Sequence, residues 1–315
     1  MKLGFWTLLS SECEWDNEEI AQRAASLGYD GVDLRVHRRD GRPSLGSNIS
    51  LDSGEAKVAG TRAAFAAAGV EIASLLCYNA SPVAGSVAAW TEFEREIELH
   101  ADLADRLGTS RIRIVVEGPP DGLTWAAYLE RVWETAGQVL DKHPGMDAVI
   151  ENHPQRANAG QLLAMAARAG DPRLGVEFSP EHALVMQENI LELIDRYAAH
   201  IHKVCFADRR VVQDDLARFD GHYYYVRYEP CWNGDGIVPT GEMLARLARG
   251  GFADYISLKY ERSAIYGLHL PPAQLALEHF PGFIRQFPAS SSRERGTGDT
   301  EGKQSRDLPF GIAKT

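Results

Sequence analysis

A carboxylate and an imidazole follow directly on a short apolar segment in the middle of the chain. Residues 148–150 are Ala, Val and Ile, and they are followed by Glu151, an asparagine and His153. Pro154 then ends the segment, because proline has no N–H to donate to a neighbouring strand. This pattern predicts a buried strand whose C-terminal end brings Glu151 and His153 to one place, where the carboxylate can act as a general base. The alternative is that Glu151 is a buried ion-pair partner without a chemical role.

Basic residues are concentrated at the end of a second strand-like segment, residues 31–36. Asp33 and Arg35 are two residues apart and therefore share one face of that strand. Arg35 is predicted either to pair with Asp33 or to bind an anionic group of a substrate. His37 and the three arginines within residues 38–42 extend the basic character into the next loop, where they could hold a phosphate or a carboxylate. A solvated loop is the alternative.

Strand-like and helix-like segments alternate along the chain. Five helix-like runs rich in Ala, Leu and Arg end in a glycine, which is favoured where a helix closes in a left-handed turn. A strand-like run follows each glycine within a few residues. The repeat is about 37 residues long, which suits a strand–helix unit of roughly 30 residues or more. Such alternation requires a parallel sheet.

Eight units of this kind predict a single (β/α)8 barrel of the α/β class, whose active site lies at the C-terminal ends of the strands. An open doubly wound sheet is the alternative, but no Gly-x-Gly-x-x-Gly follows the first strand and no Walker loop is present. The eight predicted strands are residues 3–8, 31–36, 70–78, 112–116, 148–151, 174–178, 201–206 and 255–260.

Composition and charge restrict the class of partner. The chain of 315 residues is 44% hydrophobic and has a formal net charge of −11, which argues against a nucleic-acid partner and against docking on anionic lipid. No signal peptide or membrane span is expected. Four cysteines without Cys-x-x-Cys spacing favour a reducing, cytoplasmic location. Residues 288–315 are polar and rich in Gly and Ser, so they are predicted to be a disordered tail after a barrel domain of residues 1–287.

Six short segments of the chain resemble the xylose isomerase-like TIM barrels, a superfamily of sugar phosphate isomerases and epimerases, over about residues 1–285. The resemblance implies a barrel enzyme that acts on a small sugar-like substrate. Members typically hold one divalent metal with a Glu on the fifth strand, an Asp on the sixth, a His on the seventh and a Glu on the eighth. A second His, three residues after the Asp, contacts the substrate. The segments are Gly-Tyr-Asp-Gly-Val-Asp-Leu (28–34), Ile-Glu-Asn-His-Pro (150–154), Ser-Pro-Glu-His-Ala (179–183), Val-Cys-Phe-Ala-Asp (204–208), Gly-Asp-Gly (234–236) and Tyr-Ile-Ser-Leu-Lys-Tyr-Glu (255–261).

The resemblance implies a degenerate metal site in this chain. Glu151 matches the ligand on the fifth strand, whereas the Asp, His and Glu positions of the family are occupied by Ser179, Cys205 and Lys259. An ammonium group repels a divalent cation, and Mg²⁺ or Mn²⁺ requires several oxygen ligands. No metal cofactor is therefore expected. The alternative is a displaced site built from interior carboxylates, namely Glu151, Glu177 or Glu261.

Lys259 changes the chemistry expected of this site. Its position predicts an ammonium group that supplies part of the positive charge of the missing metal, with Glu151 and Glu177 as counter-charges. A structural ion pair is the alternative. His182 matches the substrate-contacting histidine of the family, although it could instead cap the helix that follows. Cys205 is interpreted as a small buried hydrophobic residue.

A long connection, residues 209–239, follows the seventh strand and carries Tyr223, Tyr224, Tyr225 and Trp232. Loops of this length are usually functional or disordered, and the aromatic content predicts a lid or a surface that meets a second subunit. The predicted catalytic residues are Glu151, Lys259 and His182. The predicted substrate-binding residues are Arg35, His37, His153, Glu177, Ser179, Cys205, Asp208, Glu261 and Trp232.

Two hypotheses of different class follow from these residues. The first is an isomerase, an epimerase or a related lyase that removes a proton next to a carbonyl of a small sugar or polyol without the usual metal. Glu151 would be the base, and Lys259 and His182 would stabilise the enolate. The second is a barrel without catalysis that binds a small ligand or serves as the partner subunit of an active paralogue. A homo-oligomer is compatible with both hypotheses.

Overall fold

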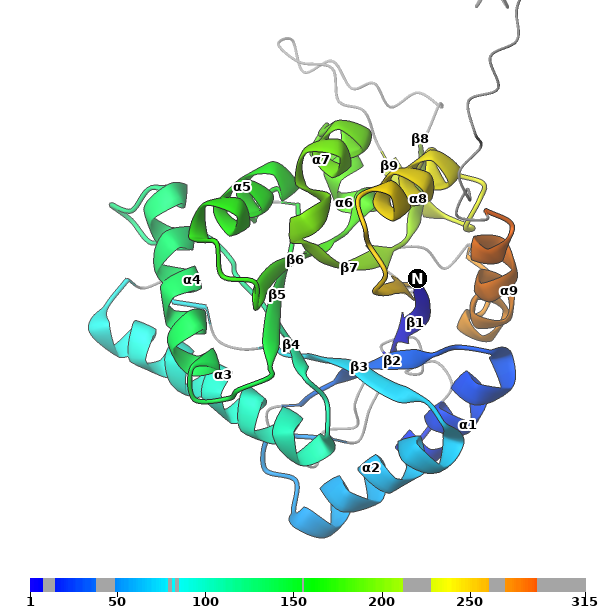
Figure 1. Ribbon diagram of the computed structural model, residues 1–315, viewed down its shortest axis with the longest axis horizontal. Helices are drawn as coiled ribbons and strands as arrows, with labels where there is room; N and C mark the ends of the chain where they lie inside the picture. Colours follow the sequence, from blue (N-terminus) through cyan, green and yellow to red (C-terminus); the bar gives the residue numbers. More distant parts are fainter. Residues whose placement is uncertain are drawn as a thin grey trace, which may run out of the picture.

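Eight parallel strands close into a barrel at the centre of the molecule (Figure 1). The computed structural model describes residues 1–7, 15–37, 49–78, 81–82, 85–154, 156–211, 228–260 and 270–287. The strand order around the barrel is β1-β10-β7-β6-β5-β4-β3-β2, and every neighbouring pair is parallel. The predicted closed barrel is therefore confirmed, and the open sheet is excluded. The strands are β1 (Lys2–Trp6), β2 (Gly31–Arg35), β3 (Glu71–Leu76), β4 (Arg111–Ile114), β5 (Asp147–Glu151), β6 (Leu174–Phe178), β7 (Ile201–Phe206) and β10 (Tyr255–Leu258).

Helices surround the barrel and return the chain from the end of one strand to the start of the next (Figure 1). Gly28, Gly69, Gly108 and Gly170 close four of these helices with φ between 66° and 77°, as the glycine spacing predicts. A side chain with a Cβ is strained in this left-handed region. The helices are α1 (Asn17–Leu27), α2 (Glu55–Ala68), α3 (Val87–Leu107), α4 (Trp125–Leu140), α5 (Ala159–Ala169), α6 (Pro180–Val185), α7 (Ile190–Tyr197), α8 (Thr240–Arg249) and α9 (Ala273–Arg285).

The interior of the barrel is polar, whereas branched apolar residues fill most barrels of this architecture. Alternate residues of a strand point to opposite faces, and Ala148 and Ile150 of β5 pack in the hydrophobic core. Asp33, Glu177 and Lys203 are also fully buried, and Lys203 contacts both carboxylates. A buried charge is tolerated only when it is paired and hydrogen-bonded. The ion pairs of the interior therefore determine which charged groups are available at the C-terminal end of the barrel.

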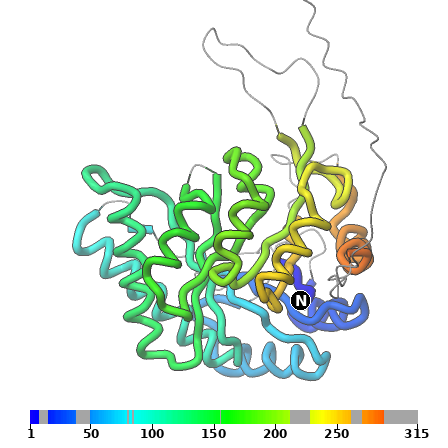
Figure 2. The backbone as a smooth tube through the Cα atoms, turned by 45° about the horizontal axis from the view of Figure 1, so that its top comes forward, coloured from blue at the N-terminus to red at the C-terminus, as the bar shows by residue number. Residues whose placement is uncertain are grey.

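A short antiparallel ribbon follows β7 and consists of β8 (Asp208–Val211) and β9 (Tyr228–Cys231). Figure 2 shows the two strands side by side at one rim of the barrel. The ribbon forms part of the long connection predicted after the seventh strand. Tyr223, Tyr224 and Tyr225 of that connection lie outside the described residues, as do Glu261 and the tail 288–315. Among the described helices, none is both long and apolar enough to cross a membrane.

Candidate active site

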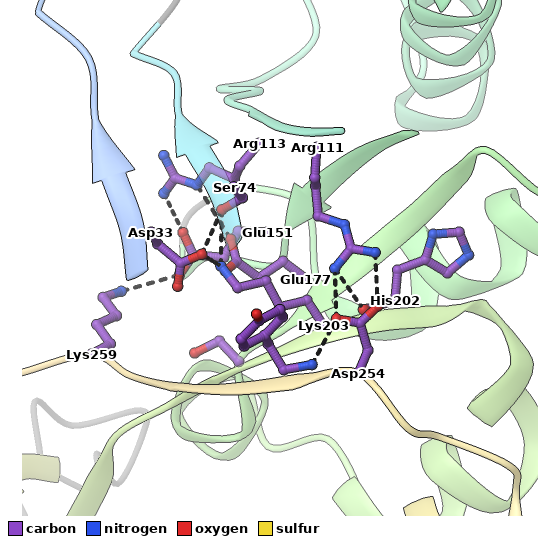
Figure 3. A network of polar contacts seen from close by, with 12 residues as sticks. Asp33, Ser74, Arg111, Arg113, Glu151, Glu177, His202, Lys203, Asp254 and Lys259 are labelled. Carbon is purple, nitrogen blue, oxygen red and sulfur yellow. Dashed lines mark hydrogen bonds and ion pairs between the residues drawn. The ribbon is translucent and has the colours of Figure 1, made fainter. Parts of the chain in front are cut away.

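Lys259 and Glu151 form an ion pair at the C-terminal end of the barrel. Lys259 follows β10 and Glu151 ends β5, and the two strands are separated by β6 and β7. The Lys259 Nζ lies 3.1 Å from the Glu151 Oε1, and their side chains are only 4% and 3% exposed. The other carboxylate oxygen, Oε2, accepts a hydrogen bond from the guanidinium of Arg113 on β4. Figure 3 shows Lys259 and Arg113 around Glu151. The predicted Lys259–Glu151 pair is confirmed.

His182 completes the predicted catalytic group. It lies in α6, the short helix that follows β6, where Pro180 occupies the first helical position. The His182 Nδ1 is 2.7 Å from the backbone oxygen of Asn152. Because a carbonyl only accepts hydrogen bonds, Nδ1 carries the proton in the neutral ring. The Nε2 lone pair then faces the Lys259 Nζ at 3.2 Å. The three predicted catalytic residues are thus brought together.

The Asn152 side chain fixes the relative position of the two strand ends that carry Glu151 and His182. Its amide nitrogen donates to the Ser179 backbone oxygen at 2.9 Å, and its amide oxygen accepts from the Ser179 backbone N–H at 2.7 Å. The Ser179 hydroxyl is buried and has no hydrogen-bond partner in the described part of the chain. The half-buried His153 packs edge-on against His182, with ring centroids 4.5 Å apart. Ser179 and His153, two of the predicted substrate-binding residues, therefore lie beside the group formed by Glu151, His182 and Lys259.

The charges of the group determine its protonation at neutral pH. Burial raises the pKa of Glu151, but the neighbouring cations Lys259 and Arg113 outweigh that effect and hold the pKa well below its ordinary value. Burial and the charge of Lys259 lower the pKa of His182 to about 3. Glu151 is consequently ionised and His182 is neutral. The site contains a carboxylate held between two cations and a neutral imidazole whose lone pair faces Lys259.

A second ion cluster lies one layer deeper in the barrel, and the sequence reasoning missed its central residue, Lys203 of β7. The Lys203 Nζ lies 2.5 Å from the Asp33 Oδ1 and 2.7 Å from the Glu177 Oε1 (Figure 3). It also donates to the Ser74 hydroxyl at 3.2 Å, and that hydroxyl donates to Asp33 at 2.6 Å. Burial opposes the charge on Lys203, but Asp33 and Glu177 raise the pKa of the lysine overall.

This deeper cluster corrects two predicted pairings. Asp33 pairs with Lys203. The predicted alternative in which Arg35 pairs with Asp33 was therefore wrong. Glu177 contacts Lys203 and, at 3.6 Å, the Arg113 Nε, so its expected role as a counter-charge of Lys259 was wrong as well. One signal in the sequence points to the missed cation, because Lys203 is two residues before Cys205 and therefore lies on the same interior face.

Aromatic rings cover the cations at the barrel mouth. The Trp6 ring centroid lies 4.8 Å from the Arg113 Cζ and 5.1 Å from the Lys259 Nζ. The guanidinium carbon of Arg35 lies 4.6 Å from the centre of the Tyr78 ring. Such cation–π contacts stabilise a partly desolvated charge. Arg35 therefore lies near the site, in a stack that the sequence did not predict.

The other predicted binding residues are held by the scaffold. His37 makes backbone hydrogen bonds with Ile49 and Leu51. Asp208 accepts backbone hydrogen bonds from the turn that contains Gly234, at distances of 3.0–3.2 Å. The Trp232 ring packs on the His279 ring at 4.8 Å. Cys205 is fully buried against Trp6 and Leu76, as expected of a small hydrophobic residue, and burial raises its thiol pKa.

The donor atoms of this site do not fit a divalent metal at the four positions that the sequence resemblance implies. Both oxygens of Glu151 are engaged by cations, and Lys259 places an ammonium group where a carboxylate ligand would be required. The Cys205 thiol stays protonated, because burial raises its pKa, and the Ser179 hydroxyl is a weak neutral ligand. Within the described ranges, no three His, Cys, Asp or Glu side chains are arranged to hold a metal ion.

Comparisons with known proteins agree with this architecture. A family model described as "Xylose isomerase-like TIM barrel" matches residues 21–286, and no curated protein matches the chain in sequence. A xylose isomerase-like TIM barrel/4-hydroxyphenylpyruvate dioxygenase fusion protein has a similar structure, with a TM-score of 0.68 and 17% identity over 93% of this chain. The chain spans only 45% of that protein.

Two further solved structures are similar over their whole length. The IOLI protein, solved with a binding zinc atom, has a TM-score of 0.68 and 16% identity, and the match covers 92% of this chain and 100% of that one. D-psicose 3-epimerase, solved in the presence of D-fructose, has a TM-score of 0.64 and 11% identity, with the same coverage. At such low identity, these similarities establish the fold alone.

Proposed function

Because this chain belongs to the xylose isomerase-like TIM barrel family, we propose that it is an isomerase- or epimerase-like enzyme that removes a proton next to a carbonyl of a small ketose or keto-sugar. The observation that carries the proposal is the contact of Lys259 with both Glu151 and His182 at the C-terminal end of the barrel. A base, a cation and a neutral imidazole within one hydrogen-bonded group are what enolisation requires.

The first step follows from the charges around Glu151. In the free protein, Lys259 and Arg113 hold its pKa low, and a carboxylate of low pKa is a weak base. A substrate carbonyl that accepts a hydrogen bond from Lys259 draws the ammonium group away from Glu151. The carboxylate then becomes more basic beside the carbon that loses its proton, while the ammonium stabilises the oxyanion that forms. Substrate binding therefore activates the base.

The hydrogen bonds of His182 limit how it can contact a substrate. Its Nδ1–H is engaged by the Asn152 carbonyl, so Nε2 can only accept a hydrogen bond. We infer that Nε2 accepts a hydrogen bond from a substrate hydroxyl once Lys259 has moved toward the carbonyl. Glu151 then returns the proton. Return to the neighbouring carbon gives isomerisation. Return to the original carbon, after the enolate has rotated to present its opposite face, gives epimerisation.

The proposal includes independence from a divalent metal. The fixed charge of Lys259 would perform the electrostatic task that a metal performs in related barrels. The exclusion of a metal from the four family positions by their chemistry supports this part of the proposal.

Exchange of substrate hydrogen with solvent tests the proposal. Purified protein is incubated in D₂O with D-fructose or D-psicose, either with EDTA or with added Mn²⁺, and ¹H NMR follows loss of the hydrogen next to the carbonyl. Exchange that is unchanged by EDTA, is abolished by Glu151→Gln and persists in the exposed control variant Glu18→Gln is the expected result. Exchange that occurs only with Mn²⁺ would contradict metal independence.

A barrel that binds a small ligand without turnover is the second candidate. The observation that favours it is that both oxygens of Glu151 are already paired, as in a purely structural cluster. Ketoses that raise the unfolding temperature of the protein but show no hydrogen exchange would support binding alone.

A further inference from the structure

A small buried chamber adjoins Lys259 on the side of the β8–β9 ribbon. Its volume is about 20 Å³, and its lining includes Lys259, Glu181, Arg209, Asn233 and Tyr260. A chamber of this size holds one group the size of a water oxygen. It belongs to neither ion cluster, yet it touches the lysine at the centre of the candidate site.

The chamber contains an unused hydrogen-bond donor. Asn233 is only 3% exposed, and its Nδ2 has no hydrogen-bond partner among the residues that the structure describes. Arg209 is paired with Glu181, with 2.6 Å between its Nε and the Glu181 Oε2. A buried amide donor without a partner is costly, and an oxygen atom in the chamber that Asn233 lines would be a candidate partner for it.

We propose that Lys259 forms an imine with the carbonyl carbon of a ketose, and that the chamber receives the oxygen atom that leaves as water. This inference rests on the proposed function, because it concerns the same substrate class at the same site. Lysine amines that attack carbonyl groups are an established route of covalent catalysis. The residues that the step needs are already in contact: an amine, an imidazole that accepts a proton, and a carboxylate.

The protons of the step balance within this group. Lys259 first gives one ammonium proton to the His182 Nε2, 3.2 Å away. The neutral Nζ attacks the carbonyl carbon, the C=O π bond breaks, and the oxygen takes a second proton from the nitrogen. The imidazolium then protonates this hydroxyl, the C–O bond breaks, and water leaves as the C=N bond forms. An ammonium and a ketone thus become an iminium and water, with no change in total charge.

An iminium provides what the enolisation lacks without a metal. It withdraws electrons from the neighbouring C–H bond more strongly than a carbonyl does. The carbon that loses its proton is two bonds from Nζ, and Glu151 lies 3.1 Å from Nζ. The iminium keeps its positive charge beside Glu151, but it replaces the N–H donors of the ammonium with a C=N bond, so the electron sink forms next to the base.

Reductive trapping tests the imine. The full-length protein is incubated with D-fructose or dihydroxyacetone and sodium cyanoborohydride at neutral pH, and its peptides are mapped by mass spectrometry. Lys259 should gain the mass of the ketose minus one oxygen atom. Its labelling should exceed that of the exposed Lys142 at least about tenfold, because the site positions the carbonyl. Lys203, which is fully buried between two carboxylates, should stay unlabelled.

Variants separate the parts of the inference. Lys142→Arg should leave labelling of Lys259 unchanged, and Asn233→Ala should lower it several-fold if the chamber binds the departing oxygen. Unchanged labelling in Asn233→Ala would overturn the role of the chamber. If Lys259 is labelled no more than Lys142 while the protein still exchanges substrate hydrogen in D₂O, the imine is overturned and the proposed function stands. Labelling of Lys259 without hydrogen exchange would support the imine and refute the proposed function.

Discussion

The Lys203 Nζ lies 2.5 Å from the Asp33 Oδ1, so that a fully buried lysine of β7 is joined to the carboxylate of β2 across the interior of the barrel. Strands β1 and β10 separate β7 from β2 in the barrel wall. The contact therefore exists only because the sheet closes. With Glu177 as its second carboxylate, Lys203 is the centre of a structural ion cluster beneath the candidate site.

Lys203→Met should strongly destabilise the protein. The variant leaves the buried carboxylates of Asp33 and Glu177 without their cation, and breaking a buried ion pair from one side costs about 3–5 kcal/mol. Urea denaturation at pH 8 measures the loss. Because burial already raises the pKa of Glu177, this carboxylate can take up a proton, and the loss should be smaller at pH 5.

Neutralising the partners provides the control. Lys203→Met combined with Asp33→Asn and Glu177→Gln removes all three charges and should recover most of the stability lost in the single variant. A free energy of unfolding that stays within experimental error of the wild type in Lys203→Met would show that the cluster has no structural role.

His182 should make the protein less stable in mild acid. Its pKa is about 3 in the folded protein, against 6.5 for an ordinary histidine. Between these values the unfolded chain binds a proton that the folded chain does not bind, so stability falls as the pH drops through this window. From pH 7 to pH 5 the loss due to this residue is about 2 kcal/mol.

The measurement compares the wild type with His182→Asn by urea denaturation at pH 7 and pH 5. The variant should lose about 2 kcal/mol less than the wild type over this interval, because it lacks the titrating ring. His202, which has no contact with His182, titrates in both proteins and cancels in the comparison. Equal losses in the two proteins would refute the neutral, buried state of His182.

The purified protein should carry well under one divalent ion per chain. Lys259 and Arg113 already neutralise Glu151, so a bound cation would have to displace two charged partners. Elemental mass spectrometry of protein prepared without chelator measures the metal content. Stoichiometric Mn²⁺, Mg²⁺ or Zn²⁺ that survives dialysis and disappears in Glu151→Gln would instead establish a displaced metal site.

Local sequence signals were sufficient to predict the fold. Each predicted strand corresponds to a strand of the barrel, because helix-closing glycines such as Gly28 and Gly108 mark where one unit ends. The family resemblance, residue by residue, also identified Glu151, His182 and Lys259, which the structure places in mutual contact.

The ion partners in the interior could not be predicted in the same way. Arg113 and Lys203 lie in strand-like segments whose neighbours are apolar, and charged residues are rarely fully buried. Which carboxylate each cation meets depends on the closure and stagger of the barrel, and this information is not local in the sequence. Asp208 was predicted to bind the substrate for a similar reason. It binds the backbone of a turn that begins at Gly234, 26 residues later, so this contact is not local in the sequence either.

Lys259→Met and Glu151→Gln separate a catalytic pair from a structural one. In Lys259→Met, Glu151 keeps its second cation, Arg113. The cost in stability should therefore be about 1–3 kcal/mol. Lys203→Met should cost more, because it removes the Asp33 ion pair and leaves Glu177 with only the more distant Arg113. Hydrogen exchange of the ketose in D₂O should fall roughly 10²-fold or more in each variant, because each removes a group that acts on the transition state.

The double variant supplies the decisive comparison. If the pair is only structural, the stability lost in Lys259→Met and in Glu151→Gln should be recovered in the double variant. If the pair is catalytic, the single variants lose exchange activity with a modest loss of stability, and the double variant recovers no activity. Urea denaturation and NMR exchange on the same four proteins distinguish the two cases, since only the structural case couples the loss of stability in each single variant to its recovery in the double.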